Sequence, residues 1–193
     1  MRAHRLLAEL LEKAIENLEA SYNYSLTNLI SSSCFDSTTA PSISLSKYID
    51  RIHQYSNCSE SCYVLAFIYI DRLLQNYPNF ALTKKSAHRL VLTSILLAIK
   101  YLDDLYYNNS VYAMIGGISL AEINHLEKNL ITLLHYNLHI DQQLFLQYDS
   151  RIKIQYQKII EEKNQPTNKF KQFSKSLNEA TSTMSEATIP PSD

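Results

Sequence analysis

The longest apolar run in the chain spans residues 90–99, where only Thr93 and Ser94 interrupt the apolar side chains. The run is long for a buried strand and shows no alternation of apolar and polar positions, so it predicts a helix buried on nearly every side. About ten residues fall well short of the roughly 20 that span a bilayer, so we expect this helix to lie among other helices. Lys100 ends the run, where it is either a cation placed for a purpose or a side chain that only extends to solvent.

Amphipathic patterns predict further helices on both sides of this central run. Residues 3–20 carry a leucine-rich stripe opposite charged positions, and similar stripes follow the central run. Residues typical of helix ends mark the boundaries. Helix starts are indicated by Ser42 or Ser44, Asn57-x-x-Glu60, Thr83, Ser119-x-x-Glu122 and Asp141, and helix ends by Pro78 and by Gly116 or Gly117.

The composition favours one all-α domain with tails. The chain has 193 residues, enough for a single domain of ordinary size. Only two glycines occur, and both phosphate-binding loops and sheets usually need more. Residues 31–42 have the composition of a linker, and beyond Glu162 the chain turns polar, so we expect residues 163–193 to be disordered.

Charge and cysteine content narrow the function further. The net charge of -1 gives no basic surface for nucleic acid. Three cysteines, an odd number, and an N-terminus without an uninterrupted apolar stretch argue for a reducing compartment. We therefore expect a protein of the cytoplasm or the nucleus that binds neither nucleic acid nor membrane.

No pattern of catalytic or metal-binding residues is evident. Cys58-x3-Cys62 and His135-x3-His139 each place two ligands one helical turn apart, but neither pair has the further ligands that zinc requires. The chain also has no glycine-rich phosphate loop and no nucleophile elbow. We expect no catalytic residue, no metal and no cofactor.

Asp71 is a charged residue with apolar residues on both sides of it in the sequence. An unpaired buried carboxylate costs several kcal/mol, so a cation from another helix is expected, and Arg51 is the candidate. Alternatively, Asp71 faces water and pairs with nothing.

Several segments together resemble one known family. They are PSISL, YIDRI, CSESCYVLAFIYIDRL, LTKKSAHRLVLTSILLAIKYLDD and YYNNSVYAMIGGISLAEINHLE, which cover about residues 41–138. The pattern is similar to the cyclin box of P-type cyclins, also called U-type, a group that includes phosphate-responsive cyclins. The resemblance implies a single five-helix box at 41–140. The residue pattern adds an amphipathic helix and linker at 1–40 and a helix at 141–162.

The resemblance also implies a partner and residue roles. Cyclins of this kind bind and activate a cyclin-dependent kinase in a heterodimer, and a Lys and a Glu that contact the kinase match Lys100 and Glu127. A bracing ion pair matches Arg51 and Asp71. Apolar kinase contacts flank the Lys and the Glu, and at the corresponding positions plain core packing is the alternative. These positions are Leu97, Tyr101, Ile131 and Leu138.

Two departures from the better-known cell-cycle cyclins limit what is carried over. Their substrate-docking patch has a Met before the Arg, whereas here Asp50 precedes Arg51, and His53 and Gln54 follow. We therefore expect no substrate docking at this patch, and we expect a single box because the residues after it are too few for a second five-helix domain. A helical adaptor with the same fold that binds no kinase is the alternative function.

Overall fold

In a computed structural model of the chain, the structure describes residues 3–22 and 33–164. These residues form helices and connecting segments without a strand among them, which confirms the all-α prediction. The predicted disordered tail lies, from residue 165 onward, outside the described residues. The helices are α1 (Ala3–Tyr22), α2 (Leu45–Ser56), α3 (Glu60–Asn76), α4 (Ala87–Leu102), α5 (Asn109–Gly116), α6 (Leu120–Leu133) and α7 (Gln142–Asn164).

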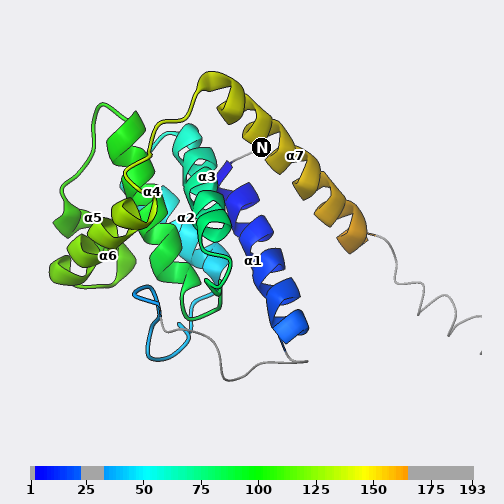
Figure 1. Cartoon of the computed structure of the whole chain (residues 1–193), viewed down its shortest axis with the longest axis horizontal. Helices are drawn as coiled ribbons and strands as arrows, with labels where there is room; N and C mark the ends of the chain where they lie inside the picture. Colours follow the sequence, from blue (N-terminus) through cyan, green and yellow to red (C-terminus); the bar gives the residue numbers. More distant parts are fainter. Residues whose placement is uncertain (1–2, 23–32, 165–193) are drawn as a thin grey trace, which may run out of the picture. The chain divides into compact units, whose positions relative to one another are not determined.

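Helix α4 is the centre of the packing. It contacts α2, α3, α5 and α6, and Figure 1 shows α3 on one side of it and α5 and α6 on the other. Every residue from 90 to 99 is buried, including both polar ones. The Thr93 hydroxyl donates to the Arg89 carbonyl oxygen at 2.7 Å, which satisfies its polarity inside the helix. The predicted buried central helix is confirmed.

Helices α2 to α6 lie within the segment 41–140 that the resemblance assigns to the box, and α1 and α7 flank them in sequence. Helix α1 contacts α2 and α3. The described part of the chain as far as Tyr156 forms one compact unit. Within this unit, Leu6 of α1 and Ile152 of α7 share a small apolar cluster with Val64 and Ile68 of α3.

Most predicted helix starts are confirmed by capping hydrogen bonds. Side-chain oxygens of Ser44 and Ser119 accept the backbone N–H of Lys47 and Glu122, and Asp141 accepts that of Leu144 at 2.8 Å.

Two predicted starts are wrong. Asn57 has φ 51° and closes α2, because an asparagine tolerates the left-handed conformation at the end of a helix. Helix α3 begins at Glu60 instead. Thr83 caps a turn over residues 84–86 by accepting the Ser86 N–H, and α4 begins only at Ala87.

The two glycines end α5, as predicted. Gly117 has φ 70°, the left-handed conformation that a C-terminal cap requires. Gly116 has another reason to be glycine, because a Cβ there would lie 2.3 Å from Leu92 Cδ2 of α4. The absence of a side chain therefore lets α5 approach α4 closely.

Candidate partner-binding site

Lys100 and Glu127 form an ion pair where α4, α5 and α6 meet. Lys100 stands in the last turn of α4, and its Nζ lies 2.6 Å from Glu127 Oε1 of α6. A cation at the C-terminus of a helix also interacts favourably with the helix dipole. The structure thus brings together the two charged residues that the resemblance singled out.

Asn109, in the first turn of α5, holds the second oxygen of Glu127. Its Nδ2 donates to Glu127 Oε2 at 2.8 Å and to Asn124 Oδ1 at 2.7 Å. The Glu127 carboxylate is therefore fixed from two directions, by α4 and by α5. Asn109 was not predicted as a site residue, although it stands at the start of a predicted helix that follows Lys100 closely in the chain.

The ion pair lies at the surface rather than in the core. Lys100 is 28% exposed and Glu127 is 15% exposed. Pairs with this much access to water contribute little to folding, typically up to about 1 kcal/mol. The contribution of this ion pair to stability is therefore too small to explain why a lysine follows the buried part of α4.

An exposed apolar surface adjoins the ion pair along the chain. We call it the 101–107 surface, and its apolar members are Tyr101, Leu102, Leu105, Tyr106 and Tyr107. Leu105 is 89% exposed, which leaves nearly its whole side chain in water. Contiguous exposed apolar side chains, unlike single ones, are typical of protein-binding surfaces.

The loop that carries this surface is attached to the domain at both ends. At its start, Asp103 Oδ2 accepts the Ser59 N–H at 3.0 Å and the Cys62 S–H at 3.3 Å, at the beginning of α3. At its end, the Tyr107 N–H donates to the Tyr112 hydroxyl oxygen of α5 at 3.3 Å. The apolar side chains between these anchors are thus presented by a loop with fixed ends.

The four flanking apolar residues have different environments. Tyr101 is 43% exposed, and its hydroxyl lies 3.1 Å from His139 Nδ1. Ile131 and Leu138 pack partly against the core and stay half-buried. Leu97 is only 3% exposed, which favours core packing, the alternative for this position, over contact with a partner.

The predicted bracing pair of Arg51 and Asp71 is wrong. Half-buried Asp71 accepts hydrogen bonds from the Tyr148 hydroxyl at 2.5 Å and from Gln75 Nε2 at 2.7 Å. The Arg51 guanidinium instead lies over the Tyr48 ring, 5.0 Å from its centroid. The predicted pair required a fully buried carboxylate, whereas Asp71 is half-buried, at an edge of α3 that α7 covers only in part.

Comparison with known proteins assigns the family. A family model described as Cyclin matches residues 3–138, which is well over half of the chain. That span contains α1 to α6 and the complete Lys100 and Glu127 site.

The chain belongs to the cyclin family.

Plant cyclins are among its relatives. Cyclin-P4-1 of Oryza sativa is 38% identical over 149 residues, covering 76% of this chain and 70% of the relative. Cyclin-U4-1 of Arabidopsis thaliana is 37% identical over 147 residues, covering 76% of this chain and 72% of the relative. Cyclin-P3-1 of Oryza sativa is 41% identical over 145 residues, covering 74% of this chain and 60% of the relative. The resemblance to P-type and U-type cyclins is confirmed.

Family membership also gives the general role. Cyclins are non-catalytic regulatory proteins, and the family in general implies a cyclin-dependent kinase as partner. Within the described ranges, no helix of this cyclin is both long enough and apolar enough to cross a membrane.

Proposed function

We propose that this cyclin binds a cyclin-dependent serine/threonine kinase as a heterodimer and activates it by positioning the αC helix of the kinase. The observation that carries the proposal is the Lys100 and Glu127 ion pair beside the exposed 101–107 surface. The proposed kinase-binding box is residues 41–140, flanked by the segments 1–40 and 141–162. Cytoplasm and nucleus are the proposed compartments, and roles in cell division and phosphate signalling are both compatible with such a complex.

The proposed binding site combines directional and apolar contacts. Lys100 has three donor hydrogens, and Glu127 Oε1 uses one of them, which leaves donors for backbone carbonyl oxygens of a partner. Glu127 is kept in place by Asn109, so it is preorganised to accept a hydrogen bond. Tyr101, with Ile131 and Leu138, would add apolar contacts around the charged centre.

Activation would follow from conformational selection in the kinase. A kinase is active when its αC helix is turned inward, so that the ion pair between its own Lys and Glu forms and its activation loop opens. A cyclin that binds only the inward αC helix shifts the population toward that state. In this mechanism the cyclin contributes binding energy and no catalytic group.

The charge-swapped variant Lys100→Glu with Glu127→Lys tests the proposal directly. The two side chains bond to each other, so the swap can keep an intramolecular ion pair while it reverses the polarity offered to a partner. Wild type and variant are used to capture proteins from native lysate, with bound kinases identified by mass spectrometry and phosphorylation of a histone or peptide assayed. We expect the wild type to retain a cyclin-dependent kinase and the variant to lose it.

The same helices supply a matched control. Arg89 of α4 and Glu122 of α6 also form an ion pair, with 23% and 32% exposure, at the start of both helices. The swap Arg89→Glu with Glu122→Arg should leave kinase capture unchanged. Single variants Lys100→Ala and Glu127→Ala should each weaken binding about 10- to 150-fold, because a charged hydrogen bond contributes roughly 1.5 to 3 kcal/mol.

Two outcomes would contradict the proposal. If folded Lys100→Ala and Glu127→Ala variants bind the kinase as tightly as the wild type, these residues are not the contact. If the wild type captures no kinase and no kinase activity, the chain acts as an adaptor with a cyclin fold.

A further inference from the structure

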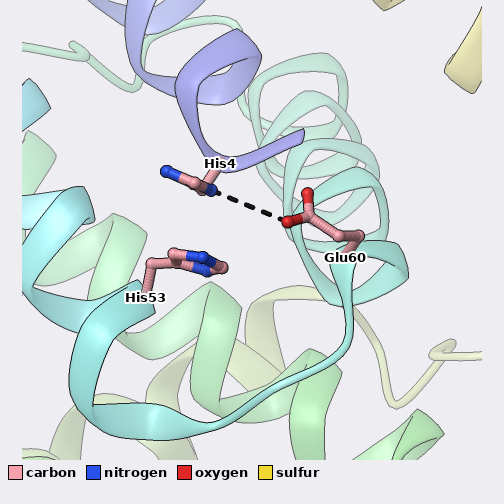
Figure 2. Close-up of side chains that lie close together, drawn as sticks. All are labelled: His4, His53 and Glu60. Carbon is pink, nitrogen blue, oxygen red and sulfur yellow. Dashed lines mark ion pairs between the residues drawn. The ribbon is translucent and has the colours of Figure 1, made fainter. Parts of the chain in front are cut away.

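Two histidines and a glutamate from three different helices lie together, away from the proposed kinase site. His4 of α1, His53 of α2 and Glu60 of α3 each offer one ligand atom, and these atoms lie within 4.8 Å of one another. Figure 2 shows the His53 ring beside that of His4, and Glu60 facing His4. The two rings are stacked, with centroids 3.8 Å apart and planes 16° from parallel.

His4 has an unsatisfied nitrogen in this group. Its side chain is 2% exposed, its Nε2 lies 3.4 Å from Asp50 Oδ1, and its Nδ1 lies 3.9 Å from Glu60 Oε1. Nδ1 has no hydrogen-bond partner among the described residues. A neutral imidazole carries one proton, so with that proton on Nε2, toward Asp50, the Nδ1 lone pair faces a carboxylate oxygen. His4 Nδ1 and Glu60 Oε1 are then two acceptors that face each other at 3.9 Å, and a cation between them would stabilise both.

The charges around the group fit a cation. Asp50 and Glu60 bring two negative charges, Arg5 at the same recess brings one positive charge, and neutral imidazoles bring none, so the group is net negative without an ion. The neutral ring is the form of histidine that binds metal.

The ligand types indicate which class of ion. Imidazole nitrogen together with carboxylate oxygen suits zinc and related transition metals, whereas magnesium and calcium prefer oxygen ligands alone. His53 Nδ1 lies 3.1 Å from the Tyr63 hydroxyl, which leaves Nε2 of His53 for an ion. Hydrogen bonds of this kind to the second ring nitrogen orient metal-binding histidines.

The ion can reach the group from solvent. An open recess is lined by His4, Arg5, Asp50, His53 and Gln54. Metal-to-ligand distances of about 2.0–2.2 Å require the ligand atoms to close in by roughly 1 Å and the stacked rings to turn toward a common point. Glu60 is exposed and His53 is half-buried, so both have room to make this adjustment.

We propose that His4, His53 and Glu60 bind a divalent transition-metal ion of the zinc class, with Asp50 orienting His4. The three ligands come from α1, α2 and α3, so the bound ion would fasten the N-terminal helix to the first two helices of the proposed box. The chain would then be more stable with metal than without it, because an ion that binds only the folded state stabilises that state.

The test uses the full chain without an affinity tag, stripped of metal by a chelator and dialysed. Zn²⁺ is titrated by calorimetry, and thermal unfolding is followed with and without Zn²⁺. We expect one Zn²⁺ per chain and a higher unfolding temperature in its presence. Glu60→Gln and His53→Gln change the less buried ligands, and each should weaken binding at least about tenfold, with the fold checked by circular dichroism.

Two control variants separate this group from other ligands. His125→Gln removes an exposed histidine of α6, and Cys58→Ser removes a thiol that donates to the Tyr63 hydroxyl. Both should bind Zn²⁺ like the wild type, and Co²⁺ in place of Zn²⁺ should give no thiolate charge-transfer absorption. The proposal is overturned if no Zn²⁺ binds, if Glu60→Gln and His53→Gln bind undiminished, or if Cys58→Ser abolishes binding.

Discussion

At the residue scale, the hydrogen bonds of Asp71 set what its substitution costs. Its carboxylate accepts from Tyr148 of α7 and from Gln75 of α3. Because a hydrogen bond to a charged group contributes roughly 1.5 to 3 kcal/mol and Asp71 is only half-buried, Asp71→Ala should lower the free energy of unfolding by about 1 to 3 kcal/mol. Urea denaturation measures this change.

A double-mutant cycle checks that these are the relevant partners. Asp71→Ala and Tyr148→Phe should be coupled by about 1 kcal/mol, because both remove the same hydrogen bond. Asp71→Ala and Arg51→Ala should be additive within about 0.5 kcal/mol, because Arg51 lies over Tyr48 instead. Strong coupling of Asp71 to Arg51 would restore the bracing pair that the sequence suggested.

The sequence predicted where a residue stands along its helix, but it did not predict which neighbouring helix covers that residue. The end of the apolar run predicted that Lys100 leaves the core, whereas its role in binding a partner came only from the resemblance. The surroundings of Leu97 and Asp71 could not be predicted in this way, because the burial of a residue depends on which neighbouring helix covers its face. Leu97 is covered and Asp71 is covered only in part.

At the element scale, the close contact of α5 with α4 depends on Gly116. A Cβ at this position would lie 2.3 Å from Leu92 Cδ2 and 3.3 Å from the Tyr48 hydroxyl oxygen. In an exposed helix, a change from Gly to Ala is stabilising by up to about 1 kcal/mol. Here we expect Gly116→Ala to lower the free energy of unfolding by about 1 to 3 kcal/mol, because the added methyl overpacks the contact.

Urea denaturation of Gly116→Ala and of a control, Met114→Ala, measures the effect. Met114 belongs to the same helix and is 76% exposed, so its truncation should change stability by less than about 0.5 kcal/mol. Because α5 carries Asn109, which supports Glu127, Gly116→Ala should also weaken partner binding. If Gly116→Ala is as stable as the wild type or more stable, α5 can move to accommodate the added methyl group and the prediction is wrong.

Element boundaries were predictable where a cap acts through its own side chain. Ser44, Ser119 and Asp141 each accept a backbone N–H three residues on, as their spacing indicated. The start of α3 was missed because part of its N-terminal hydrogen bonding comes from Asp103, which is 44 residues away in the chain. A cap supplied from another element leaves no local pattern in the sequence.

At the scale of the whole molecule, buried His88 makes stability depend on pH. Its Nε2 lies 2.9 Å from the Ile43 carbonyl oxygen. Burial lowers the pKa of His88 below its ordinary value of 6.5, against the raising effects of the Ile43 hydrogen bond and of Glu12. The unfolded chain therefore takes up this proton at a higher pH than the folded chain.

The sign of the pH effect follows from this difference. The contribution of neutral His88 to stability is complete above pH 6.5 and is lost as the pH falls below that value. We expect the urea midpoint to be lower at about pH 5.5 than at about pH 7.5, measured with a chelator present. His88→Gln, which keeps a donor for Ile43, should show a smaller difference, and an equal difference would assign the effect to other groups.

The sequence by itself determined the helices and the buried central helix, because periodicity and turn chemistry are local properties of a chain. The resemblance to cyclins rested on the similarity of several whole segments to that family. The sequence also determined that Lys100 leaves the core at the end of the central helix. Tertiary structure alone decided the rest. It placed Lys100 beside Glu127, and it placed Asp71 where the Tyr148 hydroxyl donates a hydrogen bond to it. It also brought His4, His53 and Glu60 together from three helices. Contacts between residues far apart in sequence depend on how helix faces pack, and no local pattern specifies that packing.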